Sequence, residues 1–313
     1  MIDSTVTVIS LSYNSTDLIQ SVNSVINQSY PSIEYILIDD GSENFNPKSI
    51  CDYVNENKSD SIKKFTLLTN ERNMGTVYTL NRAVKVSVGR YVFNLGGDDR
   101  FHDDRVIADW VDFFNETGAL VSTAKMAVYK NGEYLWEQPS EEQINKIRSY
   151  STEELFNSIA PCNFIFGSCT ARSRDCLEKY GLFDEHYRYI EDHSMNLRLL
   201  RNGVKFFFFD RVVIDYTTGG ISSPSVRNEM FEKDVDEIFK NEAYPYVISK
   251  KKALRDFRRF KREKNRTFSY CKYSERLKNC GSSRIKKTSI KIAHYAAHPI
   301  EAVRAIKSKL KKP

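Results

Sequence analysis

Two adjacent carboxylates, Asp98 and Asp99, stand at the end of an apolar run in the stretch NLGGDDRF, residues 94–101. Two glycines lead into them, and glycine lets a ligand approach the backbone closely. The pair could be a solvated turn, or it could bind a divalent metal, because Mg²⁺ and Mn²⁺ prefer hard oxygen ligands shared with phosphate and water. Asp103 and Asp104 fit the cap and first turn of a following helix, where acids are favoured.

A second pair of acids, Asp39 and Asp40, follows another apolar run in the stretch LIDDGS. Aspartates just after a strand often hydrogen-bond to nearby backbone, which would make an Asx-type turn. The same carboxylates could accept hydrogen bonds from a nucleotide base or ribose. The pair alone does not decide between a structural turn and a nucleotide contact.

A cation and an amide, Arg72 and Asn73, precede the glycine that opens an expected helix over residues 74–89. The N-terminus of a helix favours anions, because its N–H groups are free and its dipole is positive there. Together with the arginine, this end of the helix suits the pyrophosphate or sugar of a donor molecule. A capped loop without a ligand accounts for the same residues.

A third pair of acids, Glu191 and Asp192, falls near the start of an expected helix over residues 190–203. Acids in a first turn stabilise a helix through its dipole. A carboxylate beside a metal–diphosphate could instead take the proton of an alcohol as a general base. We expect His193 to lie at the surface or behind the site rather than to bind a metal.

The segments that position these acids alternate between strands and helices. β-Branched apolar runs predict strands. The segment after the first strand, with Leu18, Val22 and Val25 on one face, and the segment 74–89 predict helices. This order predicts an α/β fold with a Rossmann-like, mostly parallel sheet covered by helices on both faces. Ligands of such sheets bind beyond the carboxyl ends of the strands, so the first two acid pairs should face one crevice. The four predicted strands span residues 5–13, 33–42, 64–70 and 90–99.

Further along the chain the pattern is mixed. A helix is expected near 103–117, a short helix after the stretch 168–176, and more strands on either side of the helix over 190–203. These additional strands are expected at 119–130, 133–137, 204–210 and 211–218.

Charge is distributed unevenly along the 313 residues. Residues 250–313 contain 22 Lys+Arg and 4 Asp+Glu, whereas the rest contains 25 and 37. Such an asymmetry indicates two parts with different partners. The six cysteines form no CxxC pair and are expected to be reduced thiols. No apolar run reaches the roughly 20 residues of a transmembrane helix, and no signal-like segment opens the chain, so we expect a cytoplasmic protein.

Taken together, the motifs resemble those of glycosyltransferase family 2, which has the GT-A fold. VTVISLSYN resembles the opening strand of the family, LIDDGS its acid-glycine-serine turn, and NERNMGTVYTLNRA its Asn-x-Gly helix start. GGDDRF stands where the family has its Asp-x-Asp metal motif. FGSCTARSRDCLEKYGLFDE and YIEDHSMNLRLLRNG resemble the acceptor-side block and the catalytic Glu-Asp. The resemblance covers roughly residues 4–222.

The resemblance implies a role for each site residue. Tyr13 and Asp40 would hold the uracil of a UDP-sugar with Asp39 as a neighbour, and Arg72, with Asn73 beside it, would lie near the diphosphate or sugar. Asp98 would reach the ribose, Asp99 would coordinate Mn²⁺ or Mg²⁺, and Asp192 would be the catalytic base.

Three departures from the family pattern concern the metal and one loop. The metal motif reads Gly97-Asp98-Asp99, so the first acid of an Asp-x-Asp is missing. No histidine stands in the stretch 216–223, where some members have a further metal ligand, and Leu11 replaces a frequent proline. We therefore expect the metal to be held by Asp99, phosphates and water.

The C-terminal part lies beyond the resemblance. We expect a glycosyltransferase domain over residues 1–224, with a nucleotide-sugar half (1–102) and an acceptor half (103–224), followed by a basic helical extension over 225–313. Apolar and basic residues recur at near-helical spacing in 284–312. This pattern is typical of a helix on an anionic membrane surface, or of a helix docked on the domain with a solvated basic face. The bases and aromatics of 250–273 could also suit nucleic acid, which we rank lower.

The resulting hypothesis is an inverting glycosyltransferase that moves a sugar from a UDP-sugar to a hydroxyl of a saccharide or lipid-linked saccharide. Such an enzyme would act in surface polysaccharide synthesis, in the cytoplasm or peripherally at the inner face of the membrane. The alternatives are a nucleotidyltransferase that uses the same crevice and a non-catalytic protein that binds membrane or nucleic acid.

Overall fold

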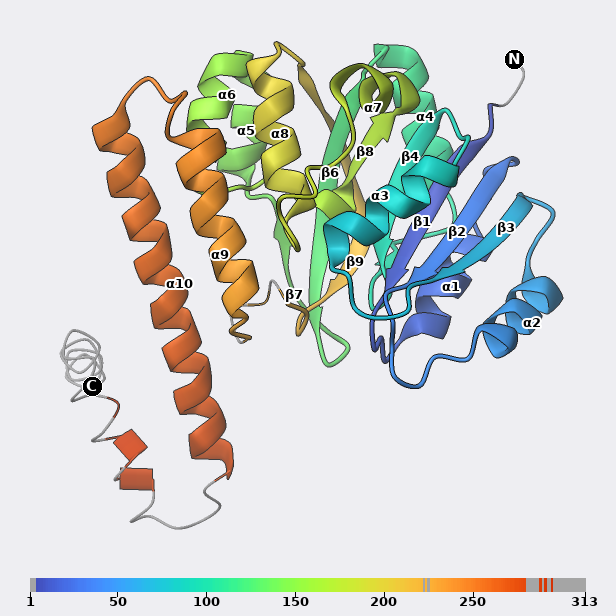
Figure 1. Cartoon of the computed structure of the whole chain (residues 1–313), viewed down its shortest axis with the longest axis horizontal. Coiled ribbons are helices and arrows are strands. Elements are labelled where there is room, and N and C mark those ends of the chain that lie inside the picture. The colour runs from blue at the N-terminus through green and yellow to red at the C-terminus, as the bar shows by residue number, and fades with distance from the viewer. Residues whose placement is uncertain are drawn as a thin grey trace, which may run out of the picture.

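The computed structural model describes residues 4–221, 223 and 226–279, together with positions 287, 288, 290, 291 and 294. The described residues form a nine-stranded sheet in the order β3-β2-β1-β4-β8-β6-β9-β5, with β7 paired to β6 (Figure 1). The strands are β1 (Val6–Ser12), β2 (Ile33–Asp39), β3 (Ile62–Thr69), β4 (Tyr91–Gly96), β5 (Arg100–Phe101), β6 (Val121–Lys130), β7 (Glu133–Gln138), β8 (Thr170–Ser173) and β9 (Phe206–Thr217).

The sheet has two halves joined by β8. Strands β1 to β4 run parallel to one another, as the alternation of strands and helices predicts. Strand β8 is antiparallel to both β4 and β6, and β9 is parallel to β6. Six strands therefore run the same way, and their carboxyl ends share one edge of the sheet, which we call the carboxyl edge.

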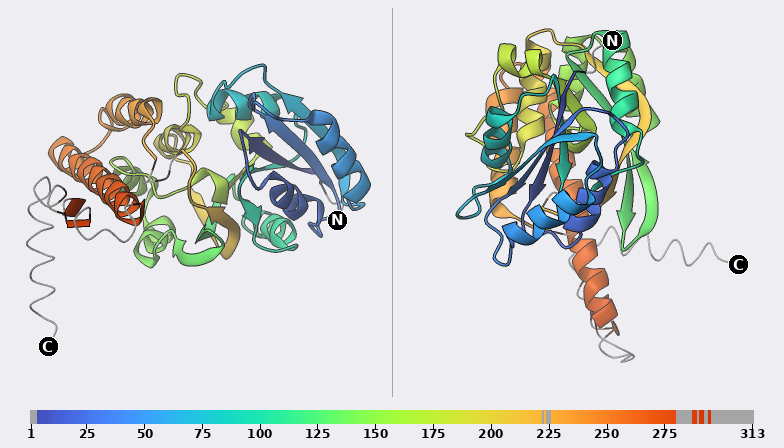
Figure 2. Two further views of the ribbon diagram at one scale, coloured as in Figure 1. Left: turned by 90° about the horizontal axis from the view of Figure 1, so that it is seen from below. Right: turned by 90° about the vertical axis from the view of Figure 1, so that its right-hand side faces the viewer.

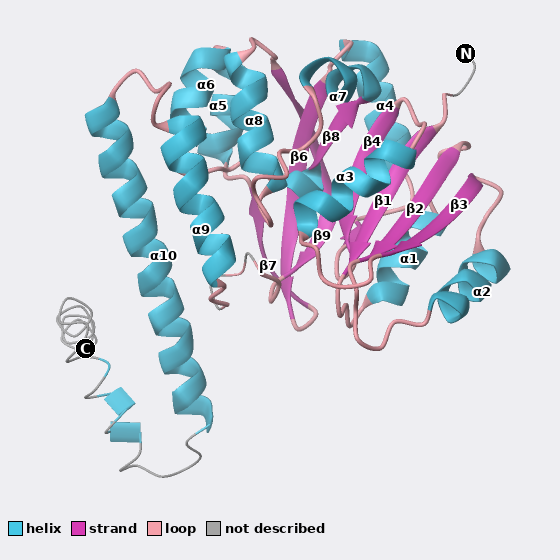
Figure 3. Cartoon of the chain, in the orientation of Figure 1, coloured by secondary structure: helices cyan, strands magenta, loops and turns pink. Residues whose placement is uncertain are grey.

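Helices cover both faces of the sheet (Figure 3). Alternate residues of β2 point to opposite faces, so Tyr35 and Leu37 join one hydrophobic cluster while Ile36 and Ile38 join the other. Helices α1, α2 and α4 cover the first face, and α3 and α5 to α9 cover the second. The helices are α1 (Leu18–Ile26), α2 (Pro47–Asn57), α3 (Thr76–Val86), α4 (Val106–Thr117), α5 (Glu141–Ser149), α6 (Thr152–Ile159), α7 (Arg174–Tyr180), α8 (Glu191–Arg201), α9 (Glu229–Ile238) and α10 (Lys250–Asn279).

Two short helices that the sequence analysis did not predict have clear start signals. Ser140 and Ser151 are the N-caps of α5 and α6, and each makes a reciprocal capping box with the residue three positions on. A capping box satisfies two otherwise unpaired N–H groups at a helix start. These helices lie with α8 on the second face of the sheet.

The expected strands 204–210 and 211–218 form one strand, β9. The register with β6 shifts between Thr123 and Lys125, where Asp210 and Arg211 interrupt the apolar pattern. A bulge lets a strand continue past such an interruption while its twist increases. Both apolar runs therefore belong to one strand, which ends at the carboxyl edge.

The C-terminal helices pack beside α8. A π-helical turn, η2 (Phe239–Ala243), continues α9, and α10 runs next to α9 and extends beyond the body of the sheet (Figure 2). Ile238, Phe239 and Ala253 join the hydrophobic cluster of the second face. None of the described helices combines the length and the apolar character needed to cross a bilayer.

Candidate functional site

The loops after β1, β2 and β4 are tied together at the carboxyl edge. Gly97 donates its N–H to the carbonyl of Leu11 at 2.7 Å, and Asp40 donates its N–H to the carbonyl of Ser12 at 2.8 Å. These bonds continue the parallel ladders into the loops, so the acids of both loops are held in fixed positions. Tyr13 follows β1 at the same edge and is 50% exposed.

Asp39 and Asp40 are both buried and serve different turns. Asp39 accepts hydrogen bonds from the backbone N–H and the hydroxyl of Ser42, at 2.9 and 2.6 Å. Asp40 accepts from Asn70 Nδ2 at 2.7 Å and from the backbone N–H groups of Met74 and Gly75 at 2.8 and 2.9 Å. Asp40 therefore fixes the loop that opens α3, while Asp39 fixes the turn directly after its own strand.

The Arg72–Asn73 loop is also held by a residue that comes shortly before α8. Arg188, in the segment between α7 and α8, donates to both the carbonyl and the side-chain oxygen of Asn73, each at 2.7 Å. A Cβ on Gly75 would lie 2.5 Å from Arg188 Cγ, so this close approach requires glycine. Arg72 is exposed, and its guanidinium is available to an anion at the start of α3.

Asp98 accepts hydrogen bonds from the start of α1. Its Oδ1 lies 2.9 Å from the backbone N of Thr16 and 3.3 Å from that of Asp17. Asp17 occupies the N-cap position of α1 but makes no side-chain cap bond of its own. Asp98 therefore supplies the capping carboxylate from a distant loop.

Asp99 points the other way, into the protein. Its Oδ1 accepts a hydrogen bond from the backbone N–H of Thr217 at 3.0 Å, at the end of β9. Burial raises the pKa of Asp99 to about 7, and the adjacent charge of Asp98 raises it further, although the Thr217 bond opposes the shift. A Cβ on Gly96 would lie 2.7 Å from Asp99 Oδ2, so a larger residue there would displace the Asp99 carboxylate.

The two halves of the sheet separate near these acids. Pairing between β4 and β8 stops at Val92, and pairing between β8 and β6 stops at Thr123. A 3-10 turn, η1 (Gly167–Cys169), lies against β4 and β6 beyond these last pairs. Residues 202–205 connect α8 directly to β9, so α8 begins at the carboxyl edge (Figure 1).

Asp192, in the first turn of α8, is held by three hydrogen bonds. Its Oδ2 accepts from Asn163 Nδ2 at 3.0 Å and from the backbone N–H of Gly167 at 3.1 Å, and its Oδ1 accepts from the N–H of His193 at 2.6 Å. Burial raises the pKa of Asp192, while these hydrogen bonds and the charge of Arg172 oppose the shift. The carboxylate is thus fixed in orientation and its proton affinity is elevated.

Glu191 lies under the same loop. A Cβ on Gly167 would lie 2.2 Å from Glu191 Oε1, so only glycine permits this contact. Burial and the neighbouring charge of Asp192 both raise the pKa of Glu191. The two acids titrate as a pair, and one of them tends to retain a proton when the other is ionised.

A buried cation lies behind this acid pair. Arg172, on β8, is 2% exposed, and it donates to Asn196 Oδ1 at 3.2 Å, while its Nε has no partner among the described residues. Asn196 in turn donates to the carbonyl of Ile165, in the loop that holds Asp192. Arg172 therefore contributes positive charge to the site without a direct carboxylate partner among the described residues.

His193 is turned away from the site. Its Nε2 lies 3.0 Å from the carbonyl oxygen of Ile159, and burial lowers its pKa to about 4. The ring is therefore neutral at pH 7 and donates from Nε2 to that carbonyl. This position agrees with the expectation that His193 supports the site rather than binds a metal.

The sequence analysis missed Arg172, Asn163, Gly167 and Arg188. Arg172 lies in strand β8, a segment that the sequence analysis interpreted only as the approach to a helix. The other three reach the acids through loops, and nothing in their local sequence indicates which side chain each will meet. Only Gly167, within the stretch FGSC, had a signal, since a glycine before a strand often marks a close backbone approach.

The described residues include no group of three or more His, Cys, Asp or Glu side chains placed to hold a metal ion. His102 and Asp215, beside the Asp98–Asp99 pair, are bonded to each other at 2.7 Å. Among the described residues, this place offers the single buried carboxylate of Asp99, because Asp98 points toward the start of α1. This donor set fits Mg²⁺ or Mn²⁺, which proteins often hold through one or two carboxylates plus substrate phosphates and water.

The sequence profile described as Glycosyl transferase family 2 matches residues 7–181, more than half of the chain and most of the elements at the carboxyl edge. The chain belongs to this family. It is a glycosyltransferase, and its curled, mostly parallel sheet is a GT-A fold.

Three proteins illustrate the similarity. A putative teichuronic acid biosynthesis glycosyltransferase, TuaG of Bacillus subtilis, is 34% identical over 102 residues, which cover 32% of this chain and 38% of that protein. S. aureus TarS 1–349 in complex with UDP-GlcNAc has a TM-score of 0.58 at 16% identity, with 91% of this chain and 79% of that chain covered. When this chain is compared with a longer TarS chain, it covers 42% of the length of that chain.

The third protein is the mannosyltransferase PcManGT from Pyrobaculum calidifontis, in complex with GDP-Man and Mn²⁺. It has a TM-score of 0.55 at 16% identity, with 97% of this chain and 79% of that chain covered. The two solved structures carry different nucleotides, so their likeness to this chain concerns the fold.

Proposed function

We propose that this glycosyltransferase moves a sugar from a UDP-sugar to a hydroxyl of a saccharide or lipid-linked saccharide, with inversion at the anomeric carbon. The observation that carries the proposal is that two acid sites, Asp98–Asp99 and Asp192, belong to different halves of the sheet but share its carboxyl edge. One can receive a nucleotide diphosphate, and the other can receive an acceptor. The UDP-GlcNAc bound to TarS supports a nucleotide-sugar donor.

On the donor side, we assign the uracil to the surface formed by Tyr13, Asp39 and Asp40. The exposed ring of Tyr13 can stack on a base, and the fixed carboxylate of Asp39 can accept from its N–H. Asp98 is assigned to the ribose, since only its Oδ1 is used by the start of α1 among the described contacts.

The diphosphate is assigned to Arg72 and the start of α3, with Asn73 positioning that loop. A guanidinium and a helix N-terminus both stabilise phosphate oxygens. Asp99 would hold a divalent metal which, when bound, stabilises negative charge on the departing diphosphate. The Mn²⁺ of PcManGT supports a metal of this kind.

On the acceptor side, Asp192 is the base. It takes the proton of the acceptor hydroxyl while that oxygen bonds to the anomeric carbon from the face opposite the diphosphate. The bond between the anomeric carbon and the phosphate oxygen breaks, and UDP leaves with the electron pair. Asn163 and Gly167 hold Asp192 in the orientation that this proton transfer requires.

Surface polysaccharide is the acceptor class that the similarity to TuaG supports. The expected membrane contact through residues 284–312 stays a prediction, because nearly all of that segment lies outside the described residues. The proposed division at residues 1–224 and 225–313 also stays a prediction.

A screen of nucleotide sugars tests the proposal. Thermal stabilisation and slow hydrolysis should be largest with a UDP-sugar in the presence of Mn²⁺, and the nucleotide product should be UDP. Release of pyrophosphate would identify a nucleotidyltransferase instead. A preference for GDP-sugars would contradict the assignment of the base-binding surface.

A further inference from the structure

The long helix α10 separates its cations into two groups. It contains 13 Lys+Arg and three acids. On its inner side, Lys261 donates to Glu232 at 2.8 Å and Lys264 donates to the same carboxylate at 2.6 Å. Acids of α9 therefore neutralise the inward cations.

The outer side carries a row of cations, which we call the outer stripe. Its members are Lys251, Arg255, Arg258, Arg262 and Arg266, all exposed. Their spacing of four, three, four and four residues places them on one face over roughly 22 Å of helix. Within the described part of the chain, only Arg255 has an acid partner, the adjacent Asp256.

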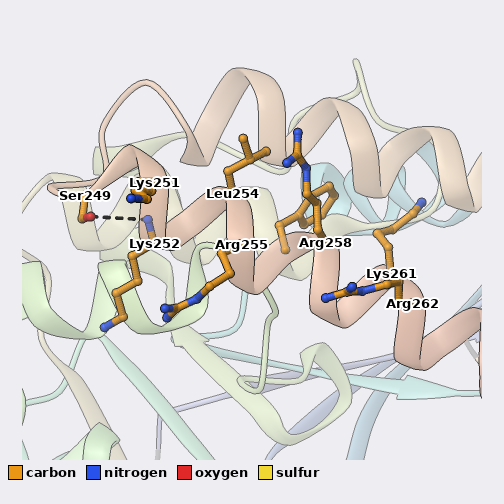
Figure 4. Close-up of a pocket in the computed structure, with 9 residues that line it drawn as sticks. Ser249, Lys251, Lys252, Leu254, Arg255, Arg258, Lys261 and Arg262 are labelled. Carbon is orange, nitrogen blue, oxygen red and sulfur yellow. Dashed lines mark hydrogen bonds between the residues drawn. The ribbon is translucent and has the colours of Figure 1, made fainter.

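The surface around the outer stripe is open. Residues 249–262 line a groove of about 800 Å³ along the helix, with the cations at its rim (Figure 4). Ile248 is 71% exposed just before α10, and Tyr270 is 55% exposed one turn after the last member of the stripe. The stripe is therefore long and open, and an apolar side chain stands near each end.

The three phenylalanines of α10 are partly buried. Phe257 stacks on Phe239 with the ring centroids 3.8 Å apart, and Phe260 and Phe268 are half-buried. Basic and aromatic residues therefore alternate in the sequence because they belong to two different faces of one helix, an exposed basic face and a packed aromatic face. Nucleic acid binding of single strands depends on aromatic platforms, and the outer stripe has none between its cations.

We propose that the outer stripe of α10 is an electrostatic docking surface for an anionic lipid bilayer. A row of cations on one helix face matches a flat layer of anionic headgroups, and the exposed Ile248 and Tyr270 can enter the headgroup region. This surface lies within described residues and is separate from the segment 284–312. It does not depend on the proposed donor or acceptor.

Co-sedimentation of the full chain with vesicles tests the docking surface. The protein should bind phosphatidylcholine vesicles that contain phosphatidylglycerol, should ignore pure phosphatidylcholine, and should bind less as salt rises. The triple variant Arg255→Gln, Arg258→Gln, Arg262→Gln should lose about a hundredfold in affinity, because each basic residue near such a surface contributes about a factor of five.

A matched control removes the same charge from the opposite side of the molecule. Lys48→Gln, Lys58→Gln, Lys63→Gln changes exposed lysines on or near α2, far from α10 (Figure 1). This control should bind anionic vesicles like the unaltered chain. Glutamine has a helix propensity close to that of arginine, so circular dichroism of the stripe variant should be unchanged.

Three results would overturn the proposal: no binding by the unaltered chain, an unchanged stripe variant, or equal losses in both triple variants. Tighter binding to polyuridylic acid than to anionic vesicles would also overturn it, since the partner would then be nucleic acid. Hydrolysis of a soluble donor should be the same in all variants, so failure of the docking surface and failure of the proposed activity are distinguishable.

Discussion

Two of the adjacent acid pairs at the carboxyl edge of the sheet, Asp98–Asp99 and Glu191–Asp192, differ in their surroundings. After β4, Asp98 and Asp99 point in opposite directions, one to the start of α1 and the other to the end of β9. At the start of α8, Glu191 and Asp192 lie under one loop and titrate together. The first pair leaves a buried negative charge that a cation can neutralise, whereas the second shares protons beside the buried Arg172. Two similar pairs of acids therefore differ in their contacts and in their protonation because different elements surround them.

The largest expected effect is at Asp192. Asp192→Asn removes the proposed base while keeping the size of the side chain, so turnover should fall by about 10³-fold while donor affinity is retained. Steady-state kinetics and calorimetry with the donor measure the two quantities. Asp175→Asn, an exposed first-turn acid of α7, is the matched control and should leave turnover unchanged. Undiminished turnover in Asp192→Asn would remove Asp192 from the mechanism.

The next effect concerns Asp99. Asp99→Asn should weaken donor binding in Mn²⁺ by about tenfold or more, as the loss of a carboxylate at a metal site does. Without metal the variant and the unaltered chain should bind the donor alike. The exposed Asp104→Asn serves as the control. Equal donor affinity of the unaltered chain with and without Mn²⁺ would argue against a metal at Asp99.

The third test measures how Arg172 and Glu191 each change the pKa of Asp192. Activity should rise with pH as the base loses its proton, so any change in the pKa of Asp192 moves this limb of the kcat/KM profile. Arg172→Met removes a positive charge that lowers the pKa of Asp192, so the limb should shift to higher pH. Glu191→Gln removes a like charge and should shift it to lower pH. Shifts in the same direction would contradict the coupling that we describe.

The smallest effect is expected at Asp98. Asp98→Ala removes the carboxylate that caps α1 and should lower the free energy of unfolding by about 1 kcal/mol, the usual cost of a lost N-cap. Urea denaturation measures this loss. Asp17→Ala should cost less, because the side chain of Asp17 makes no cap bond. A larger loss in Asp17→Ala would show that the cap is local.

Much of the fold can be predicted from local pattern. The four strands of the first half and the helices α1 and α3 follow from apolar periodicity, and the structure confirms the parallel arrangement. The prediction failed where structure depends on partners distant in sequence. Helix α2 has only two buried residues, Ile50 and Val54, so it has little apolar periodicity to detect. The insertion of β8 between β4 and β6 is visible only once the sheet exists.

The site was predictable as a set of acids but not as a set of contacts. Asp39 and Asp40 were expected at the end of β2 and are there. That Asp40 accepts three hydrogen bonds from the loop before α3 depends on how that loop folds over it, which its local sequence does not encode. The buried Arg172 carries the same lesson, because its burial depends on α8 and on the loop of residues 181–190.

The brevity of β8 has a mechanical consequence. Strands β1 and β2 are paired along seven residues, whereas β8 is paired with β4 at only two. A rotation of one half of the sheet against the other would therefore disturb few backbone hydrogen bonds at this joint. The pairing of β5 with β9, which also links the two halves, is equally short. In the proposed reaction the donor and the acceptor bind on either side of this joint, so only short backbone ladders fix the distance between them.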